Sequence, residues 1–227
     1  MIAKKITFKI DKELDKMICG RFLGFKLDGV NFGEGITYFH PKLKKVENIA
    51  SQRERKNTIS KYVDEFYNEN KKEIETALQV MQNNWKKVEK DFFKEVKNIF
   101  GKHDWPKGEY IAYLSIFNCN PTFLRDKNFQ LFYLLPKEFN RMIAHEMLHF
   151  IFYSYFEDNI RDKTKKKKSW LISEVFNAVV LNTKEFHNII KPGKELGYPD
   201  HKEIILKMKK EWKSDKRIFN WIEKFDK

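Results

Sequence analysis

Neither glycine nor proline occurs between residues 51 and 100, and this uninterrupted stretch restricts the fold more than any other feature of the chain. Glycine and proline are the residues that most often end helices, so their absence over this length favours long helices. Apolar side chains recur there at steps of three and four residues, which places them on one helical face: Leu78, Met81, Trp85, Val88, Phe92 and Val96. We therefore predict one or two long amphipathic helices over 51–100.

Short strands are predicted on both sides of this segment. Residues 2–10 fit a strand, and residues 20–41 hold five of the nine glycines, which favours turns joining short strands over a helix. Segments 109–117 and 129–135 are rich in Tyr, Phe, Leu and Ile, a composition typical of strands. The polar stretch between them contains Pro121 and is expected to join them as a loop.

Further helices are expected after Pro136, which stands where a helix can begin. No breaker follows until about Glu157, and Ser169 is a plausible N-cap for a second helix reaching about Asn182. Amphipathic spacing predicts a last helix near the end of the chain. The predicted class is α+β, with a small antiparallel or mixed sheet packed on these two helices and an N-terminal helical extension. We place an accessory region at 1–105 and a catalytic core with a C-terminal helix at 106–227.

Composition excludes several classes of protein. Hydrophobic residues make up 41% of the chain and include 21 Phe, which is enough apolar volume for a core and excludes whole-chain disorder. The apolar stretches are too short or too interrupted for a membrane span, and Lys and Asp interrupt the N-terminus where a signal peptide would need an apolar run. Two cysteines, Cys19 and Cys119, cannot build a disulfide framework. We expect a cytoplasmic protein without a membrane partner.

The net charge of +13 raises the question of a nucleic-acid partner. Only seven of the 45 basic residues are Arg, whereas nucleic-acid readers rely on the bidentate guanidinium group. Nucleic acid is therefore a possible partner but not the favoured one. The basic run at 163–168 has no Arg and no interleaved aromatic residue, so we predict a solvated loop that tolerates replacement of its lysines.

The helix predicted after Pro136 contains the pentapeptide His145-Glu146-Met147-Leu148-His149. Residues four apart share a helical face, so both imidazoles can offer a nitrogen to one metal ion. The surrounding side chains are apolar on almost every side, and burying two imidazoles and a carboxylate there is costly without a partner. Glu146 follows His145 directly and can take a proton from a water held by the ion. We predict one zinc ion bound by His145 and His149.

Zinc in a catalytic site takes a third protein ligand and keeps a fourth position for water. Glu174 is the favoured third ligand because it interrupts the apolar run 171–181, where an ionised group is costly unless it is paired or binds metal. The alternative for Glu174 is an ion pair with Arg141 or a lysine. The other downstream candidates for the third ligand are Glu185, His187, Asp200 and His201.

The sequence HEMLH followed by ISEVFN resembles the gluzincin zinc metallopeptidases, of which thermolysin is the familiar member, and the small minigluzincins most closely in size. The resemblance covers about residues 109–182, a third of the chain. It implies that His145, His149 and Glu174 bind zinc and that Glu146 is the general base. Thermolysin-like enzymes carry a carboxylate four positions after the ligand Glu to orient a zinc-bound His, but here that position is Ala178. Asn177 is the candidate replacement, as an acceptor through its side-chain oxygen.

The resemblance also implies a mechanism, namely peptide hydrolysis by attack of a zinc-bound water with Glu146 as general base. The family uses a Tyr or His to stabilise the oxyanion, and the candidates here are His201, Tyr198 and His187. We expect the substrate to be a polypeptide that adds as an extended strand to the sheet, at 110–118 or 129–135.

Three alternatives remain open. The first is a DNA- or chromatin-associated protease recruited through the basic run 163–168. The second is a catalytically idle regulatory module that binds metal or protein through the same scaffold. The third is a latent enzyme in which part of 1–105 covers the cleft and Cys19 binds the zinc as an inhibitory thiolate, whereas a lone cysteine is commonly a small core residue.

Overall fold

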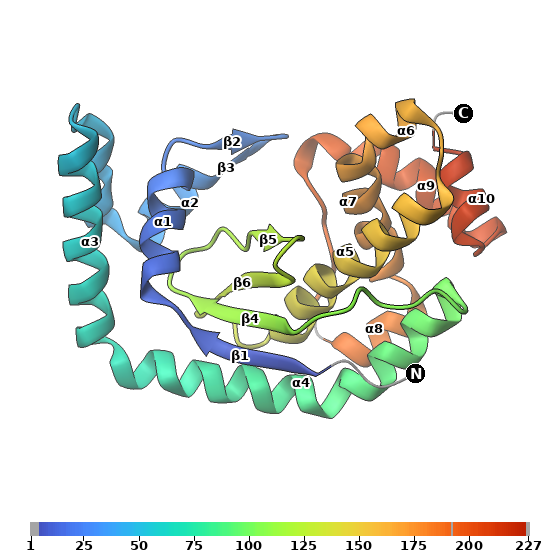
Figure 1. The fold of residues 1–227 in the computed structure, drawn as a ribbon, viewed down its shortest axis with the longest axis horizontal. Coiled ribbons are helices and arrows are strands. Elements are labelled where there is room, and N and C mark those ends of the chain that lie inside the picture. The colour runs from blue at the N-terminus through green and yellow to red at the C-terminus, as the bar shows by residue number, and fades with distance from the viewer. Residues whose placement is uncertain (1–4, 192, 226–227) are drawn as a thin grey trace. The chain divides into compact units, whose positions relative to one another are not determined.

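The computed structural model describes residues 5–191 and 193–225, and it confirms the predicted α+β class. A four-stranded mixed sheet and a separate two-stranded sheet accompany the helices (Figure 1). The strands are β1 (Ile6–Ile10), β2 (Lys26–Leu27), β3 (Val30–Asn31), β4 (Tyr110–Ser115), β5 (Thr122–Phe123) and β6 (Asn128–Phe132). The α-helices are α1 (Lys12–Phe22), α2 (Phe32–Phe39), α3 (Gln52–Glu69), α4 (Lys71–Phe100), α5 (Phe139–Asn159), α6 (Lys163–Lys167), α7 (Ser169–Val180), α8 (Lys184–Ile190), α9 (Lys202–Ser214) and α10 (Ile218–Glu223), and the 3-10 helices are η1 (Pro41–Asn48) and η2 (Pro199–His201).

The chain forms two compact units, and the division differs from the predicted boundary at residue 105. The strand unit contains the described residues up to Asn83 together with Glu109–Pro136. The helical unit contains Asn84–Gly108 and the described residues from Lys137 onward. Residues 109–136 belong with the N-terminal part of the chain because β1 pairs in parallel with β4, a pairing between residues a hundred positions apart.

The sheet of the strand unit has the order β1-β4-β6-β5. Strands β1, β4 and β6 are parallel, and β5 is antiparallel to β6. Both segments proposed to receive a substrate strand therefore lie inside the sheet, because β4 and β6 each have a strand on both sides (Figure 1). Beyond β5, the Asn120 side chain and the Pro121 carbonyl also accept hydrogen bonds from the backbone of β6. The expectation that a substrate strand adds to the sheet at 110–118 or 129–135 was therefore wrong. The edge strands of this sheet are β1 and β5.

The glycine-rich segment 20–41 forms more helix than predicted. Only the hairpin β2–β3 has the expected short strands, with Asp28 and Gly29 at positive φ in its turn. The rest is the end of α1 and the whole of α2, which contains Gly33. A side chain at Gly33 would collide with the Leu23 carbonyl, so this glycine serves a close backbone approach inside a helix instead of a turn.

The predicted long helices of 51–100 are confirmed as α3 and α4. Ser51 caps α3 by accepting a hydrogen bond from the Glu54 amide, and Gly101, at positive φ, follows the end of α4. In the helical unit, Phe92 packs on Phe186 of α8 at 6.0 Å between ring centroids. This aromatic packing continues through the unit at Phe100, Phe176, Trp212 and Trp221.

The predicted helix 136–157 is confirmed as α5, and the next predicted helix as α7, with Lys168 at the N-cap position in place of Ser169. The connection between them is not a plain loop, because the side chain of Asp162 caps the short helix α6. Lys165 of this helix is buried, and its ammonium lies 3.5 Å from Asp162 and 4.0 Å from Glu223. The other lysines of the run are exposed, so its predicted solvation holds except at Lys165.

Lys165→Ser should lower the free energy of unfolding by about 1 kcal/mol, because it removes a buried aliphatic stem and two partly screened ion pairs. Lys167→Ser, in the same helix but exposed, is the matched control and should change stability by less than ~0.5 kcal/mol. Urea unfolding of both variants measures the difference. Equal stabilities would contradict a structural role for Lys165.

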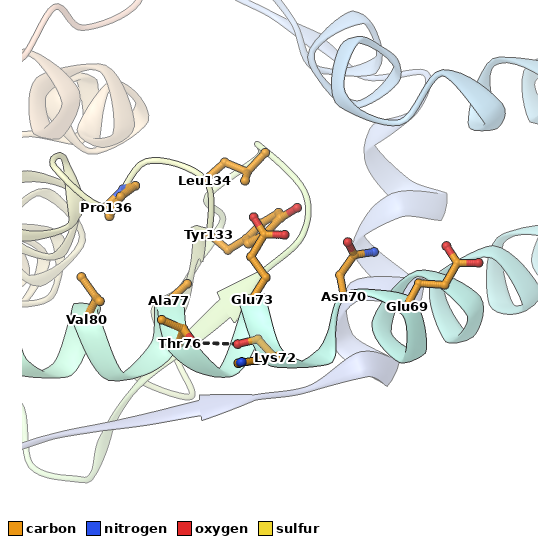
Figure 2. A pocket seen from close by; sticks show the side chains of 10 residues that line it. All are labelled: Glu69, Asn70, Lys72, Glu73, Thr76, Ala77, Val80, Tyr133, Leu134 and Pro136. Carbon is orange, nitrogen blue, oxygen red and sulfur yellow. Dashed lines mark hydrogen bonds between the residues drawn. The ribbon is translucent and has the colours of Figure 1, made fainter.

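Among the described residues, no helix is long and apolar enough to cross a membrane. The strand unit contains a cavity of about 660 Å³ where α3 meets α4, beside the segment that follows β6 (Figure 2). Its lining mixes carboxylates such as Glu73 with apolar groups such as Val80 and Leu134. None of the predicted site residues lines it.

Candidate metal centre

The two histidines of the pentapeptide lie one turn apart on α5, as the helical spacing requires. Helix α5 is buried along most of its length, including Ile143, Met147 and Ile151. The rings of His145 and His149 meet edge to face with centroids 4.7 Å apart, and their two Nε2 atoms are 3.0 Å apart. Each imidazole therefore directs its Nε2 atom to the same point.

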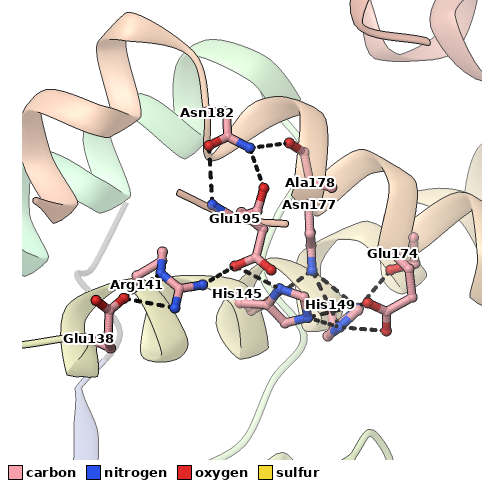
Figure 3. A network of polar contacts seen from close by, with 10 residues as sticks. Glu138, Arg141, His145, His149, Glu174, Asn177, Ala178, Asn182 and Glu195 are labelled. Atoms are coloured by element: carbon pink, nitrogen blue, oxygen red, sulfur yellow. Dashed lines mark hydrogen bonds and ion pairs between the residues drawn. The ribbon is translucent and has the colours of Figure 1, made fainter. Parts of the chain in front are cut away.

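Glu174 of α7 completes a triangle of possible ligand atoms (Figure 3). One carboxylate oxygen lies 3.4 Å from His145 Nε2, and the other lies 3.3 Å from His149 Nε2. Ligand atoms ~2.1 Å from a tetrahedral zinc are roughly 3.4 Å apart. The Nε2–Nε2 separation and the contact of each Nε2 with its nearer carboxylate oxygen are close to that spacing, and one ligand atom from each residue lies within 4.8 Å of the other two. Within the described part of the chain, this is the one group of three or more His, Cys, Asp or Glu residues arranged to hold a metal.

The outer nitrogen of each histidine, Nδ1, also has a partner, and neither partner was predicted from the sequence. His149 Nδ1 lies 2.7 Å from Ser173 Oγ, and His145 Nδ1 lies 3.5 Å from a carboxylate oxygen of Glu195. Such outer contacts select the ring tautomer and leave Nε2 available to a metal. Ser173 had a weak signal, since it precedes the proposed ligand Glu174. Glu195 lies in the segment between α8 and η2, where no motif marks it.

Asn177 is close to both histidines, but not in the predicted way. Its amide nitrogen donates to the His145 carbonyl at 3.0 Å and lies 3.3 Å from His149 Nε2. Its side-chain oxygen, the predicted acceptor, has no hydrogen-bond partner among the described residues. Asn177 thus holds the backbone of α5 against α7. At Ala178, the backbone carbonyl accepts a hydrogen bond from Asn182.

The alternative pairing of Glu174 with Arg141 is not what the structure contains. Arg141 instead binds Glu138 and Glu195, each at 2.7 Å, and Figure 3 shows this chain of contacts leading from Glu138 to His145. Arg141 and the two histidines thus connect three carboxylates, those of Glu138, Glu195 and Glu174, in one network. An arginine between two carboxylates holds the second one, Glu195, in a fixed place.

The charges around the histidines favour a cation at the cluster. Burial by itself would lower the pKa of His145, but Glu195 and Glu174 outweigh it and raise this pKa well above 6.5. Burial would raise the pKa of Glu195, yet His145 and Arg141 lower it to about 2. Burial acts on Glu174 in the same direction, and the two histidines hold the pKa of this carboxylate far below 4.5. The raised pKa of His145 indicates a negative potential at this imidazole, which a divalent cation would neutralise.

The remaining predicted residues lie around this centre or outside it. Glu146 is buried on α5. Tyr198 and His201 pack with Trp170, which lies one turn before Glu174 on α7, at centroid distances of 5.2 and 5.5 Å from its ring. The other third-ligand candidates lie outside the triangle, on α8 and η2: Glu185, His187 and Asp200.

Cys19 is a core residue of the strand unit. Its side chain is fully buried, and burial raises the pKa of its thiol well above 9. A thiolate is the form that binds zinc, so a buried thiol with a raised pKa is a poor inhibitory ligand. The structure therefore supports the core interpretation of Cys19 over a role as an inhibitory thiolate.

Neither a scan against protein-family models nor searches of curated proteins and of solved structures found a match for this chain. The feature that bears on function is therefore the arrangement of side chains on α5 and α7. Two imidazoles and one carboxylate form a ligand set that could hold a metal ion.

Proposed function

We propose that the protein is a zinc-dependent peptidase in which His145, His149 and Glu174 hold one zinc ion. The observation that carries the proposal is the convergence of two imidazole Nε2 atoms, 3.0 Å apart, with the Glu174 carboxylate, whose two oxygens lie 3.4 Å and 3.3 Å from them, on helices that also carry the motif glutamate. The donor set and the negative potential around it both suit a divalent cation. A gluzincin-type enzyme is the class of peptidase with this ligand order along the chain.

The bound zinc would polarise the scissile carbonyl and increase the acidity of water at the site. Glu146 would act as general base and take a proton from the attacking water. The water oxygen then bonds to the carbonyl carbon, the peptide C–N bond breaks, and Glu146 passes its proton to the leaving amine. Ser173 and Glu195 would keep the ligand imidazoles oriented during these steps.

We propose a polypeptide as the substrate. Tyr198 and His201 are the candidates to stabilise the oxyanion, because they gather at Trp170, at the start of the helix that carries Glu174. If the polypeptide adds as an extended strand, β1 and β5 are the edges of the four-stranded sheet. The DNA-associated alternative would use the exposed lysines of α6, which include no arginine.

Removal of the carboxylate ligand tests the metal centre directly. Wild-type protein should bind about one zinc per chain, and Glu174→Ala should weaken zinc binding by more than ~10²-fold because the change leaves only two protein ligands. Zinc content after dialysis and competition with a chromophoric chelator measure both. Glu185→Ala is the matched control, because this exposed glutamate pairs with Lys216 on the surface.

Cleavage of a broad peptide library by the same preparations tests the activity. We expect wild-type protein and Glu185→Ala to cleave and Glu174→Ala to be inactive. Wild-type protein that binds no zinc would contradict the metal centre. Wild-type protein that holds zinc and cleaves no peptide would instead favour the idle regulatory module.

A further inference from the structure

The segment between α8 and η2 brings a carboxylate to the outer face of a proposed metal ligand. Glu195 is far from α5 in sequence, yet its Oε2 lies 3.5 Å from His145 Nδ1 (Figure 3). The side chain of Glu195 is only 11% exposed, so the contact lies inside the helical unit. A buried carboxylate beside an imidazole is the arrangement that fixes which ring nitrogen carries a proton.

Contacts on two sides hold Glu195 in this position. The side chain of Asn182 holds the backbone of Glu195. It donates a hydrogen bond to the Glu195 carbonyl at 2.6 Å and accepts one from the Glu195 amide at 3.1 Å. Arg141 grips its side chain at 2.7 Å. Gly193, at φ +105°, lies so close to Glu138 that a Cβ would come within 2.8 Å of its carboxylate. The backbone at Glu195 is thus held by Asn182 and by the close approach of Gly193 to Glu138, contacts that do not involve the Glu195 carboxylate.

The two histidines differ in what holds their outer nitrogens. His149 faces a neutral hydroxyl from Ser173, whereas His145 faces an ionised carboxylate, the stronger acceptor. His145 is also the more exposed of the two, with 17% of its side chain accessible against 6% for His149. The less buried ring of His145 has more freedom to rotate, so its orientation depends more on a fixed and charged partner.

We propose that Glu195 is a positioning residue of the proposed metal centre, accepting a hydrogen bond from Nδ1–H of His145 so that Nε2 is directed to the metal. The inference rests on the proposed zinc site and adds to it a residue from outside the two ligand helices. Glu195 contacts no substrate and takes no proton in the reaction. It acts through the orientation and basicity of His145.

Variants of the two carboxylates that bind Arg141, Glu195 and Glu138, separate a positioning role of Glu195 from general structural support. Glu195→Ala removes the acceptor of His145 but keeps the backbone contacts with Asn182. Glu138→Gln perturbs the other carboxylate on Arg141, which is not the one that faces His145, and is the matched control. Glu195→Gln is the conservative variant, because an amide oxygen can still accept a hydrogen bond from Nδ1–H of His145.

Zinc affinity is measured by chelator competition on the full chain, beside the melting temperature of the metal-free variants. We expect Glu195→Ala to lose about 10- to 100-fold in zinc affinity, Glu195→Gln to regain part of it, and Glu138→Gln to stay within about threefold of wild type. Equal affinities of Glu195→Ala and wild type would overturn the positioning role alone. A loss in Glu138→Gln as large as in Glu195→Ala would also overturn it, in favour of general support by Arg141.

The proposed function fails in distinguishable ways. If wild-type protein binds no zinc, the metal centre and the role of Glu195 are both refuted. If wild-type protein binds zinc, shows the expected affinity order among the variants and cleaves no peptide, the peptidase activity is refuted while the role of Glu195 is supported.

Discussion

Glu146→Gln is expected to keep the fold and the bound zinc while it lowers the rate of peptide hydrolysis by at least ~10²-fold. The amide has nearly the same shape as the carboxylate, and Glu146 is not part of the ligand triangle, so zinc binding should persist. An amide cannot accept a proton from the attacking water, so general-base assistance is lost. Cleavage rate and zinc content, measured on the same preparation, give the result.

Two comparisons make this result specific. Glu157→Gln changes an exposed glutamate on the same helix and should leave both cleavage rate and zinc content unchanged. Glu174→Ala should lose zinc and activity together, whereas Glu146→Gln should lose activity alone. A Glu146→Gln variant with an intact cleavage rate would refute the mechanism, whatever its metal content.

The second large effect concerns the stability of the strand unit and is centred on Asp15. Its carboxylate is completely buried and accepts four hydrogen bonds, with no cation among the donors: Tyr67 Oη, Ser115 Oγ, Gln130 Nε2 and the Ile116 amide. These contacts tie α1 to α3, β4 and β6. Asp15→Ala should lower the free energy of unfolding by at least ~3 kcal/mol, because it leaves several buried donors without an acceptor and opens a cavity.

Asp15→Asn should cost much less than Asp15→Ala. The side-chain oxygen of Gln130 has no hydrogen-bond partner among the described residues, so the Gln130 amide can turn and accept from an asparagine at position 15. The hydroxyl of Ser115 can likewise accept as well as donate. Urea unfolding of both variants at pH 7 measures this order, and an Asn variant as unstable as the Ala variant would contradict it.

The same residue predicts a pH dependence of stability. Burial raises the pKa of Asp15 from 3.8 to about 6, although its four hydrogen bonds act in the opposite direction. The folded state therefore binds more protons than the unfolded state between about pH 4 and pH 6, and this contribution to stability is lost as the pH rises through that range.

Asp15→Asn removes this titration. The stability of wild type relative to Asp15→Asn should therefore fall by an amount on the order of 3 kcal/mol between about pH 4 and pH 7. Asp64→Asn, a half-exposed surface change, is the control and should not reproduce the trend. A constant difference between wild type and Asp15→Asn over this range would show that Asp15 stays ionised in the folded protein.

Features with a local cause were predictable from the sequence. The absence of breakers and the apolar spacing over 51–100 were enough for α3 and α4, because helix periodicity depends on neighbours three and four positions away. The same geometry places His145 and His149 on one face of α5. Glu174 could be predicted as a candidate ligand from its apolar neighbours in the sequence, because a buried carboxylate needs a partner whichever segment supplies it.

Features that depend on distant segments were decided by the tertiary structure. The parallel pairing of β1 with β4 places 109–136 in the strand unit and covers one side of β4. Because β5 pairs with the outer side of β6, neither β4 nor β6 has a free edge. Burial of Lys165 depends on its place beside Glu223, nearly sixty residues later, and Gly33 is needed where α2 meets the Leu23 carbonyl.

The candidate metal centre shows the same division within one site. Its two imidazoles share a helical face because they are four residues apart, so the sequence alone places them together. Glu195 reaches His145 only because Asn182 and Arg141 fix the segment that follows α8, fifty residues after the motif. No local pattern encodes such a contact, since its geometry depends on the path of the chain between the two residues and on the packing that holds that path.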